Sequence, residues 1–556
     1  MVSSSSPTDQ PHASTYDSIL LGTSLTSTIL ANYYSRIGQR VLQIDCNSYY
    51  GSYNATFNLN EYIDLCDCEP VSSNTTTTTS THTTAIDSPY HSIQCIVPTN
   101  NPNYQPRYSK FNTIHNALDD SIKSQSRYFS IDIDGTSTYI YSRSPLVDSM
   151  IDTNISQYME YQTIDIINVY GGSAAYTSTH WRCVPSDKSS VFTSSELCST
   201  DKYELMKLIG IVTNNTDKYK YDIDQLSNDN LISIPFIQYL QQYRHMSAKL
   251  CDYVLYALAL INTAQVSNIT TSDGLQRISI YLQSMNRYGN TNSALLYPIY
   301  GIAELTQSYA RNSAVHNATY MLQQRIHHIV TDTNTQQAIG VKLQSGEILY
   351  SNNIISESSY IIDNQGADNN DQLLNCICII DQPIIHTNHN HTKTSPSLYI
   401  IPPNTQPFNN SVSIQIQQLS NNTQSTPSNL YLLHCTCIHN DTATHDILNM
   451  LDILFSKTSA IDRPTLLYAS NYLQQLQSTS LNTQLPSNLH IIEYNISIDD
   501  SYRMAKQLFT NTISHVTFDD VLQSSDASDA THTNNAIYPI VQPSVDALDE
   551  LDSILQ

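Results

Sequence analysis

The chain has 556 residues and a formal net charge of −24. At about 150 residues per domain, this length allows two to four domains and a large core. The negative charge argues against a general nucleic-acid-binding protein, because phosphate contacts need clustered lysine and arginine side chains.

The cysteine count and the N-terminal residues narrow the class of protein further. The eleven cysteines are an odd number, and the polar residues 1–15 show neither the basic nor the apolar region of a secretory signal. We therefore expect free thiols in a reducing, cytoplasmic compartment, and a disordered leader over residues 1–15. No apolar run reaches the roughly 18–20 residues that a membrane-spanning helix needs.

Residues 16–50 have the outline of a dinucleotide-binding strand–turn–helix–strand unit. Gly22 ends the first strand, but Ser24 and Ser27 stand where the second and third glycines of the G-x-G-x-x-G fingerprint are expected. Because Ser24 adds a Cβ and a hydroxyl where a pyrophosphate must approach the backbone, we expect the scaffold to be present and its cofactor site to be compromised. Leucine, isoleucine and tyrosine then recur every four residues and predict one apolar helix stripe: Leu25, Ile29, Tyr33 and Ile37.

Asp45 closes the second strand, about where a ribose-binding acid belongs. An alternative is a solvated acid at a strand end that caps the next turn, and the partial fingerprint leaves both interpretations open.

The rest of the chain is divided by composition. Polar, low-complexity sequence predicts a flexible insert over 66–106, and order is expected to return at 127–133. Residues 142–265 have few glycines and prolines and predict a helical domain, in which the apolar stretch 253–261 is buried. The acidic residues 524–556 predict a disordered tail.

The second half mixes strands and helices. A helix is expected over 273–289, capped by Asp273 and ended by Gly289. Further elements are expected in this order: a turn and a helix in 295–322, strands in 325–358, a strand at 430–438 and a helix at 443–457.

Cysteine and histidine clusters are weak candidates for a metal site. The pairs Cys66/Cys68, Cys376/Cys378 and Cys435/Cys437 are C-x-C, whereas zinc sites prefer C-x₂₋₄-C with paired partners. The last two pairs lie in apolar runs with strand period, which predicts small core residues on one sheet face. His386, His389 and His391 lie in a polar loop, and we expect no bound metal.

Two long motifs stand out: "LLGTSLTSTILANYYSRIGQRVLQIDCNSYYGS" and, further along, "NRYGNTNSALLYPIYGIAELTQSYAR" (286–311). Together they resemble one known superfamily, the Rab GDP-dissociation inhibitors and Rab escort proteins. The first is similar to the opening block of that family, and the second to its R-Y-G-N-T and Y-P-x-Y-G-x-G-E-L-P-Q-x-F-A-R segments. Several other segments, among them "WRCVPSDKSSVF" and "YLLHCTCIHNDTATHDI", resemble the escort branch more than the inhibitor branch.

The chain departs from the family pattern mainly at glycines. Serine, alanine, histidine or asparagine replaces a family glycine at Ser24, Ser52, Ala303, Ser308, His316 and Asn317, and Thr306 replaces a proline. These changes bear on the geometry of the loops, above all around 303–308.

The resemblance implies a mixed α/β fold. Its large domain (16–141 and 266–523) is a flavoprotein-like, Rossmann-type FAD/NAD(P)-binding fold with a second β-sheet, and a smaller all-helical domain (142–265) is inserted into it. It also implies a non-catalytic accessory protein that uses no flavin or other cofactor. Such a protein binds newly made GDP-bound Rab GTPases and presents them to the Rab geranylgeranyltransferase αβ heterodimer. It then carries the prenylated Rab to membranes, binding the Rab's geranylgeranyl lipid and contacting the membrane transiently.

The family's Rab-binding residues fall on Tyr49, Glu304, Gln307 and Arg311. Glu304 and Arg311 are seven residues apart, so in a helix they share a face and offer an acceptor and a planar donor fork to a partner. In the alternative interpretation the two side chains pair with neighbours and only hold the loop.

The transferase contact is assigned by resemblance to Phe236, supported by the basic Arg244 and Lys249. The alternatives are core packing for Phe236 and a solvated face for the two cations. The apolar stretch 253–261 fits either a lipid groove or a core.

Two other functions are compatible with the sequence. The first is a GDP-dissociation inhibitor that recycles prenylated Rabs, and the second is a flavin-dependent oxidoreductase of the same fold.

Overall fold

The computed structural model describes most of the chain between residues 15 and 521. It describes 15–67, the backbone of 90–94, and 107–521 except for the following residues: 137–138, 165, 173–175, 185–187, 194–196, 214–230, 262–265, 267–268, 286, 289–292, 333–334, 336, 361–371, 386–395, 456–462, 477–484, 495–496, 514–515 and 519–520.

A five-stranded parallel sheet holds the predicted opening unit. Its order is β12 (Thr319–Met321), β2 (Val41–Ile44), β1 (Ser18–Leu21), β16 (Ile354–Glu357) and β22 (Leu489–Ile492). The three central strands, β2, β1 and β16, are wholly buried, as expected of a parallel sheet covered on both faces. The Rossmann-type expectation for the large domain is confirmed.

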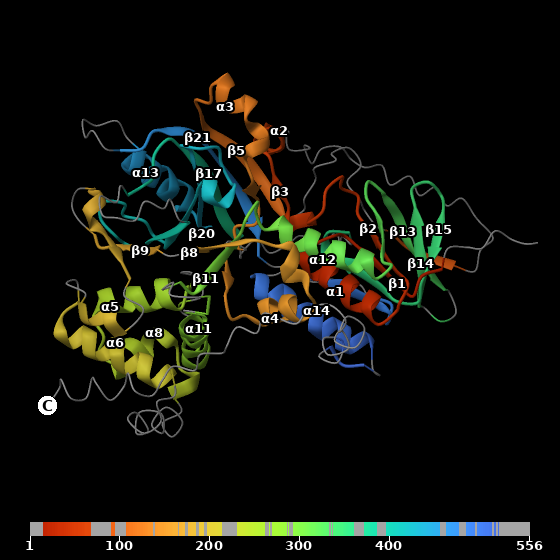
Figure 1. Ribbon diagram of the computed structural model, residues 1–556, viewed down its shortest axis with the longest axis horizontal. Coiled ribbons are helices and arrows are strands. Elements are labelled where there is room, and N and C mark those ends of the chain that lie inside the picture. The colour runs from red at the N-terminus through yellow and green to blue at the C-terminus, as the bar shows by residue number, and fades with distance from the viewer. Residues whose placement is uncertain are drawn as a thin grey trace, which may run out of the picture.

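Three helices cover one face of this sheet, and an antiparallel sheet lies against the other (Figure 1). Helix α1 (Leu25–Arg36) packs between α12 (Ala303–Val315) and α14 (Ile498–Thr512). The antiparallel sheet has the order β15 (Ile348–Tyr350), β14 (Ala338–Leu343), β13 (Ile326–Asp332) and β4 (Tyr90–Gln94).

Helix α1 differs from the predicted single stripe. Every residue of Leu25–Ser35 is buried, because α12 and α14 flank the helix on both sides. Polar contacts fix these neighbours: the Asn32 side-chain amide donates to Asn312 Oδ1 at 2.6 Å, and the Tyr34 and Thr512 hydroxyls are 2.6 Å apart.

A second, eight-stranded sheet forms the other half of the large domain. Its order is β10 (Trp181–Cys183), β9 (Ile166–Tyr170), β18 (Ser397–Ile401), β19 (Ile414–Leu419), β20 (Tyr431–Ile438), β17 (Gln372–Ile380), β21 (Leu466–Gln475) and β5 (Tyr108–Asn116). Helix α13 (Ala443–Phe455) packs on one face, where Cys376, Cys378, Cys435 and Cys437 are buried in the shared core. The prediction that these cysteines are small core residues is confirmed.

A cluster of helices lies below this sheet in the view of Figure 1. It contains α5 (Lys188–Thr193), α6 (Ser199–Val212), α8 (Phe236–Gln238), α9 (Ala248–Asp252) and α11 (Thr271–Ser284), with π-helical turns at Tyr239–Tyr243 and Tyr253–Leu258. The expected burial of 253–261 is confirmed. The helical expectation for 142–265 is wrong at 161–183, where β8 (Tyr161–Ile164), β9 and β10 join sheets.

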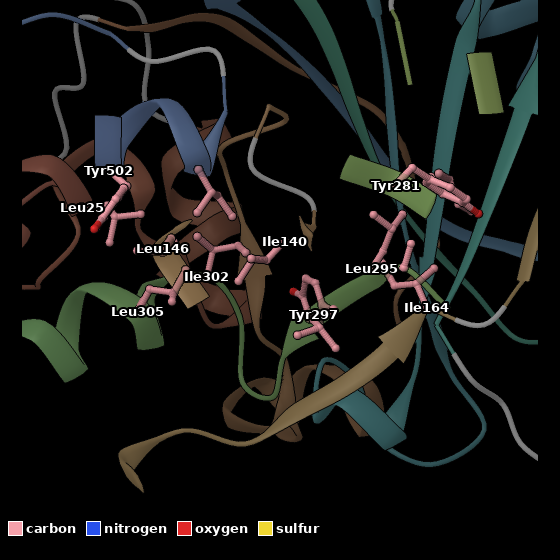
Figure 2. Packing of buried hydrophobic residues seen from close by; sticks show 14 of the residues in the cluster. Leu25, Ile140, Leu146, Ile164, Tyr281, Leu295, Tyr297, Ile302, Leu305 and Tyr502 are labelled. Carbon is pink, nitrogen blue, oxygen red and sulfur yellow. The ribbon is translucent and has the colours of Figure 1, made fainter. Parts of the chain in front are cut away.

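One continuous core joins the helical cluster to the layered sheet (Figure 2). Strand β11 (Leu295–Pro298) pairs with β7 (Ile140–Tyr141) and β8, and its Leu295 and Tyr297 lie between Tyr281 of α11 and Ile302 before α12. Helix α4 (Pro145–Asp152) adds Leu146 to the same core. The turn and helix expected in 295–322 are present, and the short strand β11 precedes the turn.

Smaller expectations also change. Order returns before 127, at β5 and α3 (Asp120–Ser124), and β4 lies inside the expected flexible insert, whose other end overlaps α2 (Leu59–Asp67). Helix α11 is capped by Thr270, whose hydroxyl accepts from the Asp273 N–H. The described strands and helices agree with the predictions for 325–358, 430–438 and 443–455. The last residue of the expected leader, Thr15, forms an isolated β-bridge with Tyr350. Residues 1–14, the tail 524–556, Cys68, Gly289 and the three loop histidines lie outside the described residues.

Candidate functional site

The turn between β1 and α1 is filled by a carboxylate from β16. Gly22 has φ +98°, and a Cβ there would lie 2.1–2.4 Å from the carboxyl atoms of Glu357. Glu357 Oε1 accepts from the Ser24 N–H at 2.7 Å, at the first turn of α1. The side chain therefore takes the position at a helix N-terminus that favours an anion.

Glu357 is fully buried, and its other oxygen binds a second loop. The Ser52 hydroxyl donates to Oε2 at 2.6 Å. Desolvation by burial, with a contribution from the nearby Asp45 carboxylate, raises the pKa of Glu357 to about 8.

This loop does not fit a dinucleotide. A diphosphate at the α1 N-terminus needs the space that the Glu357 carboxyl group occupies. Its negative charge would also face two buried acids, Glu357 and Asp45. The internal carboxylate, more than the Ser24 side chain, closes the turn.

Asp45 caps the next turn, as the second interpretation has it, but it is buried and not solvated. Its carboxylate accepts from the Thr23 hydroxyl at 2.5 Å, the Asn47 N–H at 2.8 Å and the Tyr360 hydroxyl at 3.1 Å. Burial raises its pKa despite these bonds. Both oxygens are thus used within the chain.

A second buried acid holds the start of α12. Gly301 has φ +101°, and Asp132, on β6 (Ile131–Asp132), accepts from the Ile302 N–H at 3.0 Å. The hydroxyls of Thr56 and Tyr297 also donate to this carboxylate. Desolvation raises the pKa of Asp132 to about 6.

Helix α12 presents three of the four predicted Rab-binding residues. Glu304 is half-buried, and Gln307 and Arg311 are exposed on the following turns, so the predicted shared helix face is confirmed. The Arg311 guanidinium lies 4.6 Å from the ring centroid of Tyr158, which is 39% exposed. Glu304, Gln307, Arg311 and the Tyr158 ring beside it make up a polar, charged and aromatic surface along the helix, called here the α12 strip.

Tyr49, the fourth residue, is joined to the start of this helix through two contacts. Its ring packs edge-on against Phe57, with centroids 5.0 Å apart. Phe57 belongs to β3 (Thr56–Phe57), and the hydroxyl of Thr56 accepts from the Ala303 N–H at 3.1 Å. These contacts connect Tyr49, in the first sequence motif, to the start of α12, in the second motif.

A family model described as GDP dissociation inhibitor matches residues 12–79 and 100–465. The chain belongs to the GDP dissociation inhibitor family. The two motif blocks and the site residues all lie within the matched ranges.

Family relatives agree with this assignment. Rab escort protein 1 of Arabidopsis thaliana is 24% identical over 89% of this chain and 92% of its own length. Rab proteins geranylgeranyltransferase component A 2 of Mus musculus is 27% identical over 69% of this chain, which spans 60% of that protein. The crystal structure of Rab GDI from Plasmodium falciparum superposes with a TM-score of 0.62, covering 90% of this chain and 98% of that one at 19% identity, and shows the same fold.

The two residues assigned to a transferase contact are internal. Phe236 is fully buried, and its ring fills the space beside Gly274, where a Cβ would lie 2.4 Å away. Arg244 is buried and forms an ion pair with Glu204 at 2.7 Å. Burial supports core packing for Phe236, and Arg244 does not lie on a solvated face. Lys249, the second cation named beside Phe236, is exposed.

A separate cavity of about 630 Å³ lies between α11, the eight-stranded sheet and the start of α14. Tyr139, Arg277 and Asp499 are among its lining residues, and desolvation raises the pKa of Asp499 to about 6. None of the four predicted Rab-binding residues lines it, so it is distinct from the α12 strip.

Over the described residues, no group of histidine, cysteine and acidic side chains has the arrangement of a metal site. In the same part of the chain, no helix has the length and apolar character needed to cross a membrane.

Sequence reasoning missed Glu357 and Asp132. The only sequence signal was an acid at the end of an apolar strand, in "IISE" and in "SIDID", which is common and carries no partner information. Both acids find their partners more than 70 residues away, at Ser24 and Ser52 for Glu357 and at Thr56 and Ile302 for Asp132.

Proposed function

We propose that this chain is a Rab escort protein, the accessory component A of Rab geranylgeranyltransferase. It binds newly made GDP-bound Rab GTPases, presents them to the αβ heterodimer for C-terminal geranylgeranylation, and delivers the lipid-bearing product to membranes. It acts from the cytosol and carries out no bond chemistry itself.

The exposed face of α12 carries this proposal. Glu304 offers an acceptor and Arg311 a rigid fork of donors, about 10 Å apart along the helix. Tyr49 adds an amphipathic ring of the kind enriched at protein-binding surfaces. The relatives named for Rab escort and for the transferase component support the choice of a Rab as partner.

A reconstituted prenylation assay tests the proposal. Unprenylated Rab, the αβ transferase and geranylgeranyl diphosphate are mixed with and without the full chain, and lipid incorporation is measured. We expect the chain to stimulate incorporation. If it does not, yet extracts prenylated Rab from membranes, the chain is a recycling inhibitor and the escort proposal is wrong.

An oxidoreductase is disfavoured by the Glu357 carboxylate in the Gly22 turn. An absorbance scan of the purified chain tests this separately, since a stoichiometric flavin band would contradict the non-enzymatic assignment.

A further inference from the structure

The loop that carries Tyr49 crosses the carboxyl ends of three neighbouring strands, β2, β1 and β16. In open α/β sheets this edge is where ligands bind. Here it is closed by residues of the chain. Segment 45–52 continues directly from β2, its Gly51 N–H binds the Thr23 hydroxyl just after β1, and its Ser52 hydroxyl binds Glu357 at the end of β16.

Both ends of the segment are anchored. At its start, the Asp45 carboxylate accepts from the Thr23 hydroxyl at 2.5 Å and from the Tyr360 hydroxyl at 3.1 Å. At its end, the Gly51 N–H lies 3.1 Å from the Thr23 hydroxyl oxygen, and the Ser52 hydroxyl donates to Glu357. Tyr49 lies between the two anchors and is only half-buried.

Ser52 has an unusual backbone for its residue type. Its φ is +49°, in the left-handed region where a non-glycine residue is strained, and it is 2% exposed. Such a conformation persists where its surroundings fix it, and the fixing contact here is the bond of the Ser52 hydroxyl to the buried Glu357 carboxylate. Ser24, which also replaces a family glycine, binds the same carboxylate through its N–H.

We propose that Glu357 is a positioning residue for Rab binding: its carboxylate stands in the place of a diphosphate and, through Ser24 and Ser52, fixes the loop that presents Tyr49. The inference rests on the proposed function, because Tyr49 is assigned to the Rab surface there. It extends that function by giving the turn between β1 and α1 a role, and it explains why serine suits position 52, where the side-chain hydroxyl binds Glu357.

The physical effect is preorganisation. A loop held in one conformation loses less conformational freedom when a partner binds, so the contact made by Tyr49 costs less to form. Glu357 has no exposed surface and acts only through the loop.

A double-mutant cycle on the full chain tests the proposal. Glu357→Gln, Tyr49→Ala and the double variant are titrated against GDP-bound, fluorescently labelled Rab, and the thermal unfolding midpoint of each is recorded. We expect Glu357→Gln to weaken binding about tenfold in the unchanged background and less than twofold once Tyr49 is alanine, because the two residues act through one contact. A merely structural role would give the same loss in both backgrounds, and that outcome, or no loss in either, overturns the inference.

Two further variants keep the test decisive. Ser52→Ala removes one bond and leaves the Glu357 side chain unaltered, and it is taken through the same cycle if Glu357→Gln does not fold. Glu347→Gln, at an exposed carboxylate in the turn before β15, is the matched control and should bind like the unchanged chain. Failure of the unchanged chain to bind Rab overturns the proposed function, whereas binding with additive losses overturns only the role of Glu357.

Discussion

Helices α1 and α12 share the same arrangement at their N-termini but differ in how much of each helix is buried. Each follows a glycine in the left-handed region, Gly22 or Gly301, and each has a backbone N–H near its start bound by a buried carboxylate from a distant strand. Around α1 every side is covered, whereas α12 keeps Gln307 and Arg311 exposed to solvent. The carboxylate at the start of α1 therefore positions a helix of the core, whereas the one at the start of α12 positions a helix with an exposed face.

The two carboxylates also differ in how well their charge is satisfied. Asp132 accepts from two hydroxyls and one N–H, and its pKa rises to about 6. Glu357 accepts from one hydroxyl and one N–H, and its pKa rises further, to about 8. Desolvation is the largest cause of both shifts, and a nearby carboxylate, Asp134 for Asp132 and Asp45 for Glu357, adds to each.

The largest expected effect comes from adding a methyl group at either turn. Gly301→Ala puts a Cβ 2.7 Å from Asp132 Oδ1 in a strained backbone, and Gly22→Ala puts one 2.1 Å from the Glu357 carboxyl carbon. We expect each to lower the free energy of unfolding by about 3 kcal/mol, from backbone strain and a displaced carboxylate. Chemical denaturation measures this loss.

Gly346→Ala separates the two causes. Gly346 has φ +94° but no atom within 4 Å of its would-be Cβ, so strain alone should cost about 1 kcal/mol. Equal losses at all three glycines would show that the carboxylates add nothing.

A pH series distinguishes the two acids. A carboxyl whose pKa is higher in the folded than in the unfolded chain binds more protons when folded, so its contribution to stability falls as pH rises between the two values. For Glu357 this window runs from its ordinary value of 4.5 to about 8, and for Asp132 from 3.8 to about 6.

Glu357→Gln should therefore gain about 2 kcal/mol relative to the unchanged chain between pH 6 and pH 8. Asp132→Asn should show its relative gain below pH 6 and little change above it. Urea unfolding at each pH measures both differences, and parallel curves for the two variants would contradict the distinction between the acids.

The smallest expected effect is confined to the surface. Arg311→Ala should weaken Rab binding by about 1–2 kcal/mol and leave the unfolding midpoint unchanged, because the side chain is exposed and packs on the partly exposed Tyr158 ring. Isothermal titration with GDP-bound Rab measures the change. Arg40→Ala, at an exposed ion pair with Asp17, is the matched control and should bind normally. An unaltered affinity for Arg311→Ala would remove this residue from the surface.

Local patterns were enough to predict several elements. The strand–turn–helix–strand unit, the helix carrying Glu304 and Arg311, the buried stretch 253–261 and the core cysteines follow from the period of apolar residues. The same reasoning failed at 161–183, because those short strands are stabilised by pairing with distant chain segments and have little signal of their own.

The sequence by itself determined the family, the parallel-sheet scaffold and the residues of the α12 face, because those depend on motifs and on local periodicity. Tertiary structure alone decided what fills the Gly22 turn, why α1 is buried on every side, and that Phe236 and Arg244 are internal. The physical reason is that a buried carboxylate or ring is defined by its partners, and those of Glu357 lie more than 300 residues away along the chain.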